Sequence, residues 1–295
     1  MEAVWRFTSS WNVRGGSIMA QAVFNRYEKK YLMPEPVYQE LRFRLAPYMQ
    51  TDQYGLHTIC NIYYDTPGYD LIRRSIEKPV YKEKLRLRSY GIPTLDSPVF
   101  LEIKKKYRKV VNKRRIQLTL QEAYDYVERG IQPAQGGDYV ERGIQPAQSC
   151  KYAEHGIRSA QDRQILQEIN FFLYRYPLMR GIYLAYDRTA LFGMEDPEFR
   201  VTFDQRIRSR RSFMGLENGD YGELLLPEGY YLMESKVLGA TPLWFTEILS
   251  ELEIYPVSFS KYGNVYKKEH GVFDLEQMMI HRNENWEENR RRQVC

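Results

Sequence analysis

The chain has 295 residues, a formal net charge of +5 and a pI near 8.9. The length accommodates one large domain or two small ones, and the modest charge excludes a histone-like coat for nucleic acid. Three widely spaced cysteines and four scattered histidines argue against a disulfide scaffold or a zinc site. No apolar run is long enough to cross a bilayer, so we expect a protein of the reducing cytoplasm without a membrane span.

In chain order, hydrophobic periodicity and turn residues predict a series of short elements. Strands are predicted over residues 24–32, 58–64, 81–90, 98–106, 109–118, 181–191, 199–203 and 230–238. Helices are predicted over residues 34–48, 69–76, 164–174, 242–252 and 260–268. Because regular crossover helices do not separate the strands, the pattern favours an α+β fold with an antiparallel sheet or barrel.

Three segments fall outside this pattern. Residues 1–21 are expected to be a disordered or non-native extension, and residues 276–295 a polar tail. The sequence of residues 125–135 recurs unchanged at 138–148, and a diverged third copy occupies 151–161. Near-identical adjacent copies are typical of a local duplication in a tolerant surface segment. We therefore expect a surface insertion at 125–161 within a single domain of residues 22–275.

The strand-like segments carry basic side chains at alternate positions. In residues 84–88, Lys84, Arg86 and Arg88 point to one face, and Leu85 and Leu87 point to the other. The same alternation recurs in residues 102–106, 113–115 and 234–236. Several such strands in one sheet would form a continuous basic surface. If that sheet closes, the surface becomes the wall of a tunnel that suits a polyanion.

Alternation by itself is typical of any half-exposed antiparallel sheet, and lysine also protects edge strands from aggregation. A solvated face normally mixes both signs of charge, however, and concentrated like charge is costly without a partner. The pattern therefore favours a specific anionic ligand. Among these bases, Glu234 either binds a metal ion or pairs with Lys236 or Arg88, and Glu102 is expected to form structural ion pairs.

Short motifs follow one another from about residue 22 to residue 270. They are Arg26–Leu32, Tyr63–Asp65, Lys84–Arg88, Phe100–Lys104, Lys113–Arg115, Tyr186–Arg188, Arg200–Asp204, Met233–Lys236 and Phe259–Tyr262. Each motif alone is weakly specific. In this order, the set resembles the VTC-type polyphosphate polymerase domain, a branch of the CYTH or triphosphate tunnel metalloenzyme superfamily.

The resemblance implies an antiparallel eight-stranded tunnel barrel with helices packed outside. It also implies a Mn²⁺- or Mg²⁺-dependent transfer of the γ-phosphoryl group of ATP to a growing inorganic polyphosphate chain, with release of ADP. The implied catalytic residues are Arg86, Arg88, Lys104, Arg188 and Lys236, and the implied metal ligand is Glu234. The implied substrate-binding residues are Lys30, Lys106, Lys113, Arg115, Tyr186, Arg200, Ser260 and Lys261, the last two at a helix start whose N–H groups can hold a phosphate.

The chain departs from the superfamily's hydrolases on its first strand. Those enzymes carry Glu-x-Glu-x-Lys, which binds metal and helps to activate water, whereas this chain has Arg26, Glu28 and Lys30 at the equivalent positions. Ser258 also stands where some relatives have a basic residue. The departure favours transfer to phosphate, but hydrolysis of tripolyphosphate or polyphosphate stays open.

A non-catalytic polyphosphate-binding module is a further alternative. A pure anion receptor gains nothing from an acid at Glu234, which argues against this function. Nucleic acid is not expected as a partner, because no stack of exposed aromatic residues can be placed beside the basic strands.

Overall fold

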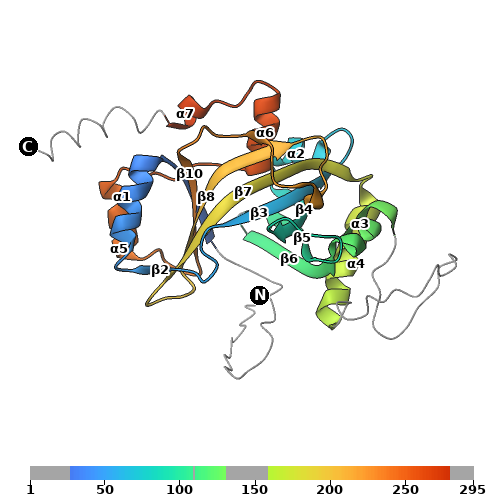
Figure 1. Ribbon diagram of the computed structural model, residues 1–295, viewed down its shortest axis with the longest axis horizontal. Helices are drawn as coiled ribbons and strands as arrows, with labels where there is room; N and C mark the ends of the chain where they lie inside the picture. The colour runs from blue at the N-terminus through green and yellow to red at the C-terminus, as the bar shows by residue number, and fades with distance from the viewer. Residues whose placement is uncertain (1–26, 109, 131–158, 280–295) are drawn as a thin grey trace, which may run out of the picture.

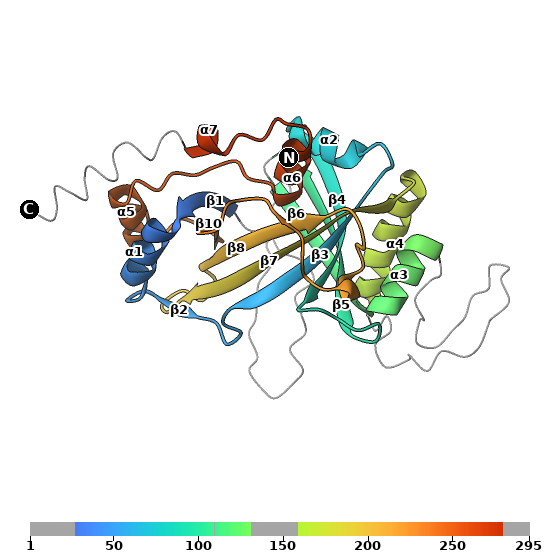
Figure 2. The ribbon, with the colours of Figure 1, turned by 45° about the horizontal axis from the view of Figure 1, so that its top comes forward.

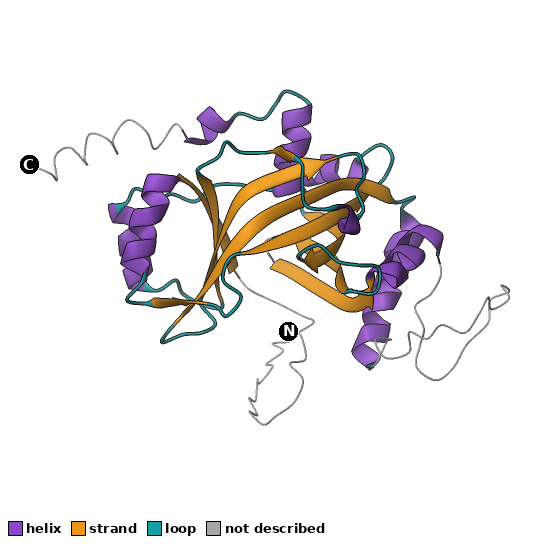
Figure 3. Ribbon diagram, viewed as in Figure 1, coloured by secondary structure: helices purple, strands orange, loops and turns teal. Residues whose placement is uncertain are grey.

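In a computed structural model, which describes residues 27–108, 110–130 and 159–279, the chain forms one antiparallel sheet (Figure 3). Eight strands cross it in the order β1-β10-β8-β7-β3-β4-β5-β6, and the short strands β2 and β9 pair with β7 and β8. The strands are β1 (Tyr27–Pro34), β2 (Met49–Thr51), β3 (His57–Asp65), β4 (Tyr81–Tyr90), β5 (Pro98–Tyr107), β6 (Val110–Thr119), β7 (Met179–Gly193), β8 (Arg200–Arg210), β9 (Glu223–Leu224) and β10 (Tyr230–Val237). The predicted α+β architecture with eight antiparallel strands is confirmed.

The helices lie around this sheet in three groups (Figures 1 and 2). They are α1 (Glu35–Leu45), α2 (Asp70–Ile76), α3 (Leu120–Arg129), α4 (Ala160–Arg175), α5 (Leu243–Glu251), α6 (Lys261–Glu269) and α7 (Leu275–Met279). The pair α1 and α5 lies at one end of the sheet, α3 and α4 at the other, and α2 and α6 together at the top. We call the sheet face that packs against α1, α3, α4 and α5 the outer face, and the opposite face the inner face.

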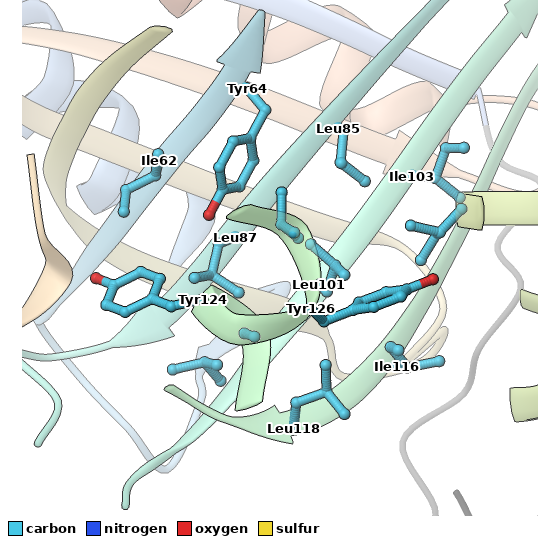
Figure 4. Close-up of a cluster of buried hydrophobic side chains, with 14 of the residues drawn as sticks. Ile62, Tyr64, Leu85, Leu87, Leu101, Ile103, Ile116, Leu118, Tyr124 and Tyr126 are labelled. Carbon is cyan, nitrogen blue, oxygen red and sulfur yellow. The ribbon is translucent and has the colours of Figure 1, made fainter. Parts of the chain in front are cut away.

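One apolar core lies between β4–β6 and the helices α3 and α4 (Figure 4). Leu85 and Leu87 of β4 and Leu101 and Ile103 of β5 are completely or almost completely buried there, as their alternation with basic residues predicts. Tyr126 of α3 packs among them. Burial of apolar side chains on this face leaves the intervening basic residues on the inner face.

A second core fills the outer face under α1 and α5 and includes Leu41, Phe203 and Phe245. A third core lies on the inner face, where apolar residues of β1, β3, β7 and β10 meet α2 and α6. Leu184 and Tyr262 belong to this third core. The inner face is therefore apolar where α2 and α6 cover it, and it carries the basic residues of β4 and β5 beyond them.

The sheet curls strongly, so that strands far apart in its order meet across the inner face. Glu28 of β1 and Lys104 of β5 lie 3.8 Å apart (Oε2 to Nζ), although five strands separate β1 from β5 in the sheet. Among the described residues, no ladder joins β1 to β6, so hydrogen bonds do not close the barrel. The segment before α6 lies beside β1 instead, where the Val257 N–H donates to the Lys30 carbonyl at 2.7 Å.

A buried carboxylate fixes the start of α2. Asp65, at the end of β3, is fully buried and accepts hydrogen bonds from the backbone N–H groups of Thr66, Leu71 and Ile72 at 2.8, 3.0 and 3.1 Å. The Tyr262 hydroxyl of α6 also donates to it at 2.9 Å. One side chain thus joins β3, α2 and α6, and it satisfies donors that a helix start leaves without intrahelical partners.

Replacement of Asp65 by alanine is expected to lower the free energy of unfolding by about 3 kcal/mol, because it leaves several buried donors without acceptors. Urea unfolding of the variant measures this loss. The control is Asp96→Ala, since Asp96 is exposed. Equal unfolding midpoints for the two variants would show that Asp65 does not hold these elements together.

The short elements β2, β9 and α7 are not among the predicted ones, and two longer elements also differ from the sequence prediction. Helix α3 was not predicted, and it takes in residues 125–129 of the expected surface insertion, where Tyr126 and Val127 are buried. Strand β8 continues to Arg210 rather than ending at residue 203, because the buried Arg208 and Arg210 find acceptors in carbonyl groups and in Asp187 and Asp220. Residues 1–26, 131–158 and 280–295, with most of the repeats, lie outside the described residues. In the part of the chain that the structure describes, no helix is both long and apolar enough for a bilayer span.

Candidate active site

The inner face gathers most of the residues that the sequence predicts to contact phosphate. Residues directly opposite each other in a ladder share a face, and Lys104 lies opposite both Lys84 and Lys113. The same face carries Lys30, Arg86, Arg88, Arg115, Tyr186, Arg188, Glu234 and Lys236. The N-terminus of α6 reaches this face, since the Oγ of its N-cap Ser260 lies 3.4 Å from Lys84 Nζ.

A buried acid holds two of these cations on β4 and β6. Glu102 accepts from Arg86 Nε at 2.5 Å and contacts Lys113 Nζ at 2.8 Å, and its side chain is 1% exposed. Burial alone would raise the pKa of Glu102, but Arg86, Lys113 and Arg88 outweigh it and hold the pKa well below its usual value. The expected structural role of Glu102 is thus matched by its ion pairs, which orient Arg86 and Lys113.

A second buried acid, Asp204 of β8, organises the opposite wall. Arg188 of β7 grips it through two parallel hydrogen bonds of 2.6 and 2.8 Å, and Lys261 of α6 donates to it at 2.5 Å. Burial disfavours the charged form, but the two cations lower the pKa of Asp204 to about 2. The carboxylate is therefore ionised at neutral pH, and it fixes the positions of Arg188 and Lys261.

Two further carboxylates lie on neighbouring strands around one lysine. Lys30 Nζ is 3.2 Å from Glu28 and 3.7 Å from Glu234, and Lys236 Nζ is 2.6 Å from Glu234. Burial opposes ionisation of Glu234, yet Lys236 and Lys30 hold its pKa well below its usual value. Both acids are thus carboxylates next to Lys104, which lies 3.8 Å from Glu28.

Arg88 differs from these cations because its partners are neutral. Its Nε donates to Asn61 Oδ1 and its Nη2 to the Tyr186 hydroxyl, both at 3.0 Å. The Lys261 ammonium lies over the Tyr186 ring, 4.3 Å from its centroid. The positive charge of Arg88 is therefore held in place by hydrogen bonds that do not neutralise it.

Two predicted substrate-binding residues share this face but lie toward the ends of their strands. Arg200, at the start of β8, is exposed and lies opposite Lys236. Lys106 lies nearer the end of β5, opposite Lys82. The inner face also holds residues that the sequence analysis did not select: Glu28, Asn61, Tyr63, Lys84 and Asp204. The alternation within residues 84–88 pointed to Lys84, whereas a contact between distant strands such as Glu28 to Lys104 has no local signal.

Mutual repulsion and burial perturb the titration of this face. Burial, together with the neighbouring Lys82, Lys104 and Lys30, lowers the pKa of Lys84 to about 8 against the opposing effect of Tyr63. Burial lowers the pKa of Lys113 to about 7, although Glu102 favours its charged form. The free protein therefore carries less positive charge here at slightly alkaline pH than its residue count suggests.

This titration predicts proton uptake when a polyanion binds. A bound phosphate stabilises the charged form of Lys84, so its pKa rises and the complex takes up protons near pH 8. The affinity for inorganic tripolyphosphate should therefore fall as the pH rises from about 7 to about 9. Calorimetry in buffers of different ionisation enthalpy measures the uptake directly.

The matched variants are Lys84→Met on the inner face and Lys105→Met on the outer face. Lys105 pairs with Glu168 of α4 at 2.9 Å, away from the inner face. Lys84→Met should reduce the proton uptake, and Lys105→Met should leave it unchanged. A binding enthalpy that is independent of the buffer would contradict the assignment.

The donors fit a hard divalent cation. No group of three or more His, Cys, Asp or Glu side chains within the described ranges could hold a metal by itself. Mg²⁺, however, is commonly held by one or two carboxylates together with substrate phosphates and water. Glu28 and Glu234 supply two such carboxylates, and Lys30 between them shows that the space accepts a cationic group.

Two solved structures match most of the chain at low similarity. A candidate adenylate cyclase from Bacillus halodurans is 15% identical with a TM-score of 0.46, and the match covers 81% of this chain and 96% of that one. A candidate adenylyl cyclase from Hippeastrum, described with a dominant triphosphatase activity, is 16% identical with a TM-score of 0.46, over 85% of this chain and 96% of that one. The comparison with curated proteins finds no match.

A protein-family model also matches most of the chain. The VTC domain model matches residues 25–270, a range that includes every strand of the sheet and helices α1 to α6. This range also contains all the charged residues of the inner face described above. The protein therefore belongs to the VTC domain family.

Proposed function

We propose that this protein is a metal-dependent polyphosphate polymerase that transfers the γ-phosphoryl group of ATP to inorganic polyphosphate. In this reaction an oxygen of the terminal phosphate of the chain bonds to the γ-phosphorus, the bond from that phosphorus to the β-bridging oxygen breaks, and ADP leaves. The observation that carries the proposal is the excess of cations on the inner face around the Glu28 and Glu234 carboxylates.

Phosphoryl transfer needs positioning and charge stabilisation more than covalent help from the protein. Arg86 and Arg188 are held by Glu102 and Asp204, and Arg88 is held by neutral partners, so none needs to reorganise when phosphate arrives. Guanidinium groups bind phosphate oxygens through two parallel hydrogen bonds. Lysine ammonium groups add point charges, which hold phosphates without a fixed geometry and so suit a polymer that moves along the inner face as it grows.

Glu28 and Glu234 would hold the divalent cation together with phosphate oxygens. When bound, such a cation neutralises charge that develops on the transferred phosphoryl group. Lys30 and Lys236 contact these carboxylates and keep them ionised. The two glutamates would thus position the cation, and the two lysines balance the negative charge of the glutamates.

Transfer is favoured over hydrolysis by the state of the acids on the inner face. Each of the carboxylates Glu28, Glu102, Asp204 and Glu234 contacts at least one lysine or arginine within 4 Å. A carboxylate with a depressed pKa is a weak base for the activation of water. Hydrolysis of tripolyphosphate by the same face is the second candidate function, because its cations would bind that substrate equally well.

One experiment tests the proposal. Purified protein is incubated with ATP and Mn²⁺, and phosphorus NMR and gel electrophoresis measure polyphosphate against free phosphate. Polymer that accumulates together with ADP is the expected result. Free phosphate without any polymer would show that the protein is a hydrolase and not a polymerase. Polyphosphate binding without any turnover would show that it is a binding module.

A further inference from the structure

The two ends of the inner face along β4 and β5 differ in chemistry. Along β4, the inner-face positions are Lys82, Lys84, Arg86, Arg88 and Tyr90, so the basic row ends in an aromatic residue. Phe100 of β5 lies directly opposite Arg88, and its ring meets that of Tyr90 edge to face, with centroids 5.8 Å apart. His57 of the neighbouring strand β3 adds a third ring, whose centroid lies 6.1 Å from that of Tyr90.

This aromatic end is accessible to a ligand. The Tyr90 side chain is 53% exposed, and Phe100 and His57 are partly buried. The Arg115 guanidinium of β6 lies over the Phe100 ring, 4.5 Å from its centroid, and supports that ring. Tyr90 thus offers an exposed ring to a flat ligand at the border of the cationic region, and Phe100 packs nearly perpendicular to it, with an interplanar angle of 81°.

At the opposite end, the described residues of β4, β5 and β6 present lysines instead of aromatic rings. Its inner-face positions are occupied by Lys82 and Lys84 of β4, Lys104 and Lys106 of β5, and Val111 of β6. The tyrosines at this end, Tyr81 and Tyr107, alternate with those positions and lie on the outer side. Burial lowers the pKa of Lys82 at this end, and the neighbouring Lys106 and Lys104 lower it further.

We propose that Tyr90 and Phe100, with His57, form a subsite that stacks on the base of the nucleotide substrate. This inference rests on the proposed function, because it assumes that a nucleoside triphosphate occupies the inner face. Bases stack readily on aromatic side chains because every base has a flat π-face. The subsite explains why aromatic residues replace lysine at one end of an otherwise basic row.

The spacing fits a nucleotide. Successive inner-face residues of a strand are roughly 7 Å apart, which is about the reach of a ribose between a base and its first phosphate. A base at Tyr90 therefore places the α-phosphate near Arg88 and directs the following phosphates toward Arg86. The γ-phosphate then points toward Lys104 and Glu28, which are 3.8 Å apart.

A direction for the polymer follows from this orientation. The base occupies the aromatic end, so the polyphosphate chain extends through the lysine end, past Lys82 and Lys106. Lysine suits this position because a point charge on a flexible stem imposes less geometry on a sliding chain than a guanidinium fork does. The two ends of one sheet face thus serve two different parts of the reaction.

The test compares two ligands that differ only in the nucleoside. Dissociation constants of ATP and of inorganic tripolyphosphate are measured by calorimetry without divalent metal, so that neither ligand is turned over. Tyr90→Ala is expected to weaken ATP at least about five-fold and to leave tripolyphosphate unchanged. Tyr90→Phe keeps the ring and should restore the ATP affinity.

The matched control is Tyr107→Ala. Tyr107 is 55% exposed, a fraction similar to that of Tyr90, but it lies at the other end of the β4–β5 pair and on the outer side of the sheet. It should leave both affinities unchanged. Unchanged ATP affinity in Tyr90→Ala, or an equal loss for both ligands, would overturn the base subsite while the phosphate site stands. Failure of the unmodified protein to bind tripolyphosphate would instead remove the proposed function itself.

Discussion

Replacement of Glu234 by glutamine is expected to abolish polymer synthesis while nucleotide binding survives. Glutamine keeps the shape of the side chain but removes the charge that a divalent cation requires. The substitution removes a negative charge beside Lys30 and Lys236. The inner face therefore becomes more cationic and still attracts phosphate. The expected result is a decrease of at least about 100-fold in turnover, with ATP bound as tightly as before or more tightly when metal is absent.

Turnover with Mn²⁺ and calorimetric ATP binding measure the two parts of this prediction separately. The control is Glu247→Gln, because Glu247 is exposed on α5, behind the outer face. Glu28→Gln should share the loss of turnover, since Glu28 lies on the other side of Lys30. Turnover of Glu234→Gln near that of the unmodified protein would exclude Glu234 as a metal ligand and leave its ion pair with Lys236 as its role.

The sequence predicted the composition of the inner face because a strand repeats every two residues. Alternation in residues 84–88 and 102–106 placed the basic residues on one face and the leucines and isoleucine on the other, as observed. The ladders of eight antiparallel strands then brought these rows together. Where the hydrophobic period is clear, the direction of each side chain follows from the sequence.

The pairing of charges across the face could not be predicted in the same way. Asp204 meets Arg188 from the next strand and Lys261 from α6, which is 57 residues away along the chain. Glu28 meets Lys104 because the sheet curls. Such contacts depend on the register and the curvature of the whole sheet, and no local pattern encodes them.

The aromatic end of the inner face escaped the sequence analysis for a related reason. Tyr90 stands two residues after Arg88, but its exposure and its contact with Phe100 depend on how β4 pairs with β5. Helix α3 was missed because its residues 125–129 were assigned to the repeat. Its capping box, in which Thr119 and Glu122 bond each other's backbone N–H, is a helix-start signal that could have revealed it.

Replacement of Arg88 by alanine is expected to lower polymer synthesis by roughly 100- to 1000-fold, as removal of a preorganised charge stabiliser does in other enzymes. Arg88 is 6% exposed, and its hydrogen bonds to Asn61 and Tyr186 hold it without neutralising it. Its charge can thus attract a phosphate, although it also acts on the nearby Glu102 carboxylate. Since this capture is electrostatic, synthesis by the unmodified protein should also fall as ionic strength rises.

Alanine at this position also leaves Asn61 without one of its partners, so a loss of activity could reflect a disturbed fold. Arg88→Lys separates the two effects, because it keeps the charge and loses the guanidinium fork. We expect intermediate activity for lysine and a thermal unfolding midpoint close to that of the unmodified protein. Arg129→Ala is the control, since the Arg129 side chain is 68% exposed on α3, on the far side of the sheet. Polymer synthesis by Arg88→Ala at the level of this control would show that Arg88 is a structural residue, and the phosphate clamp would then consist of Arg86, Arg188 and the lysines alone.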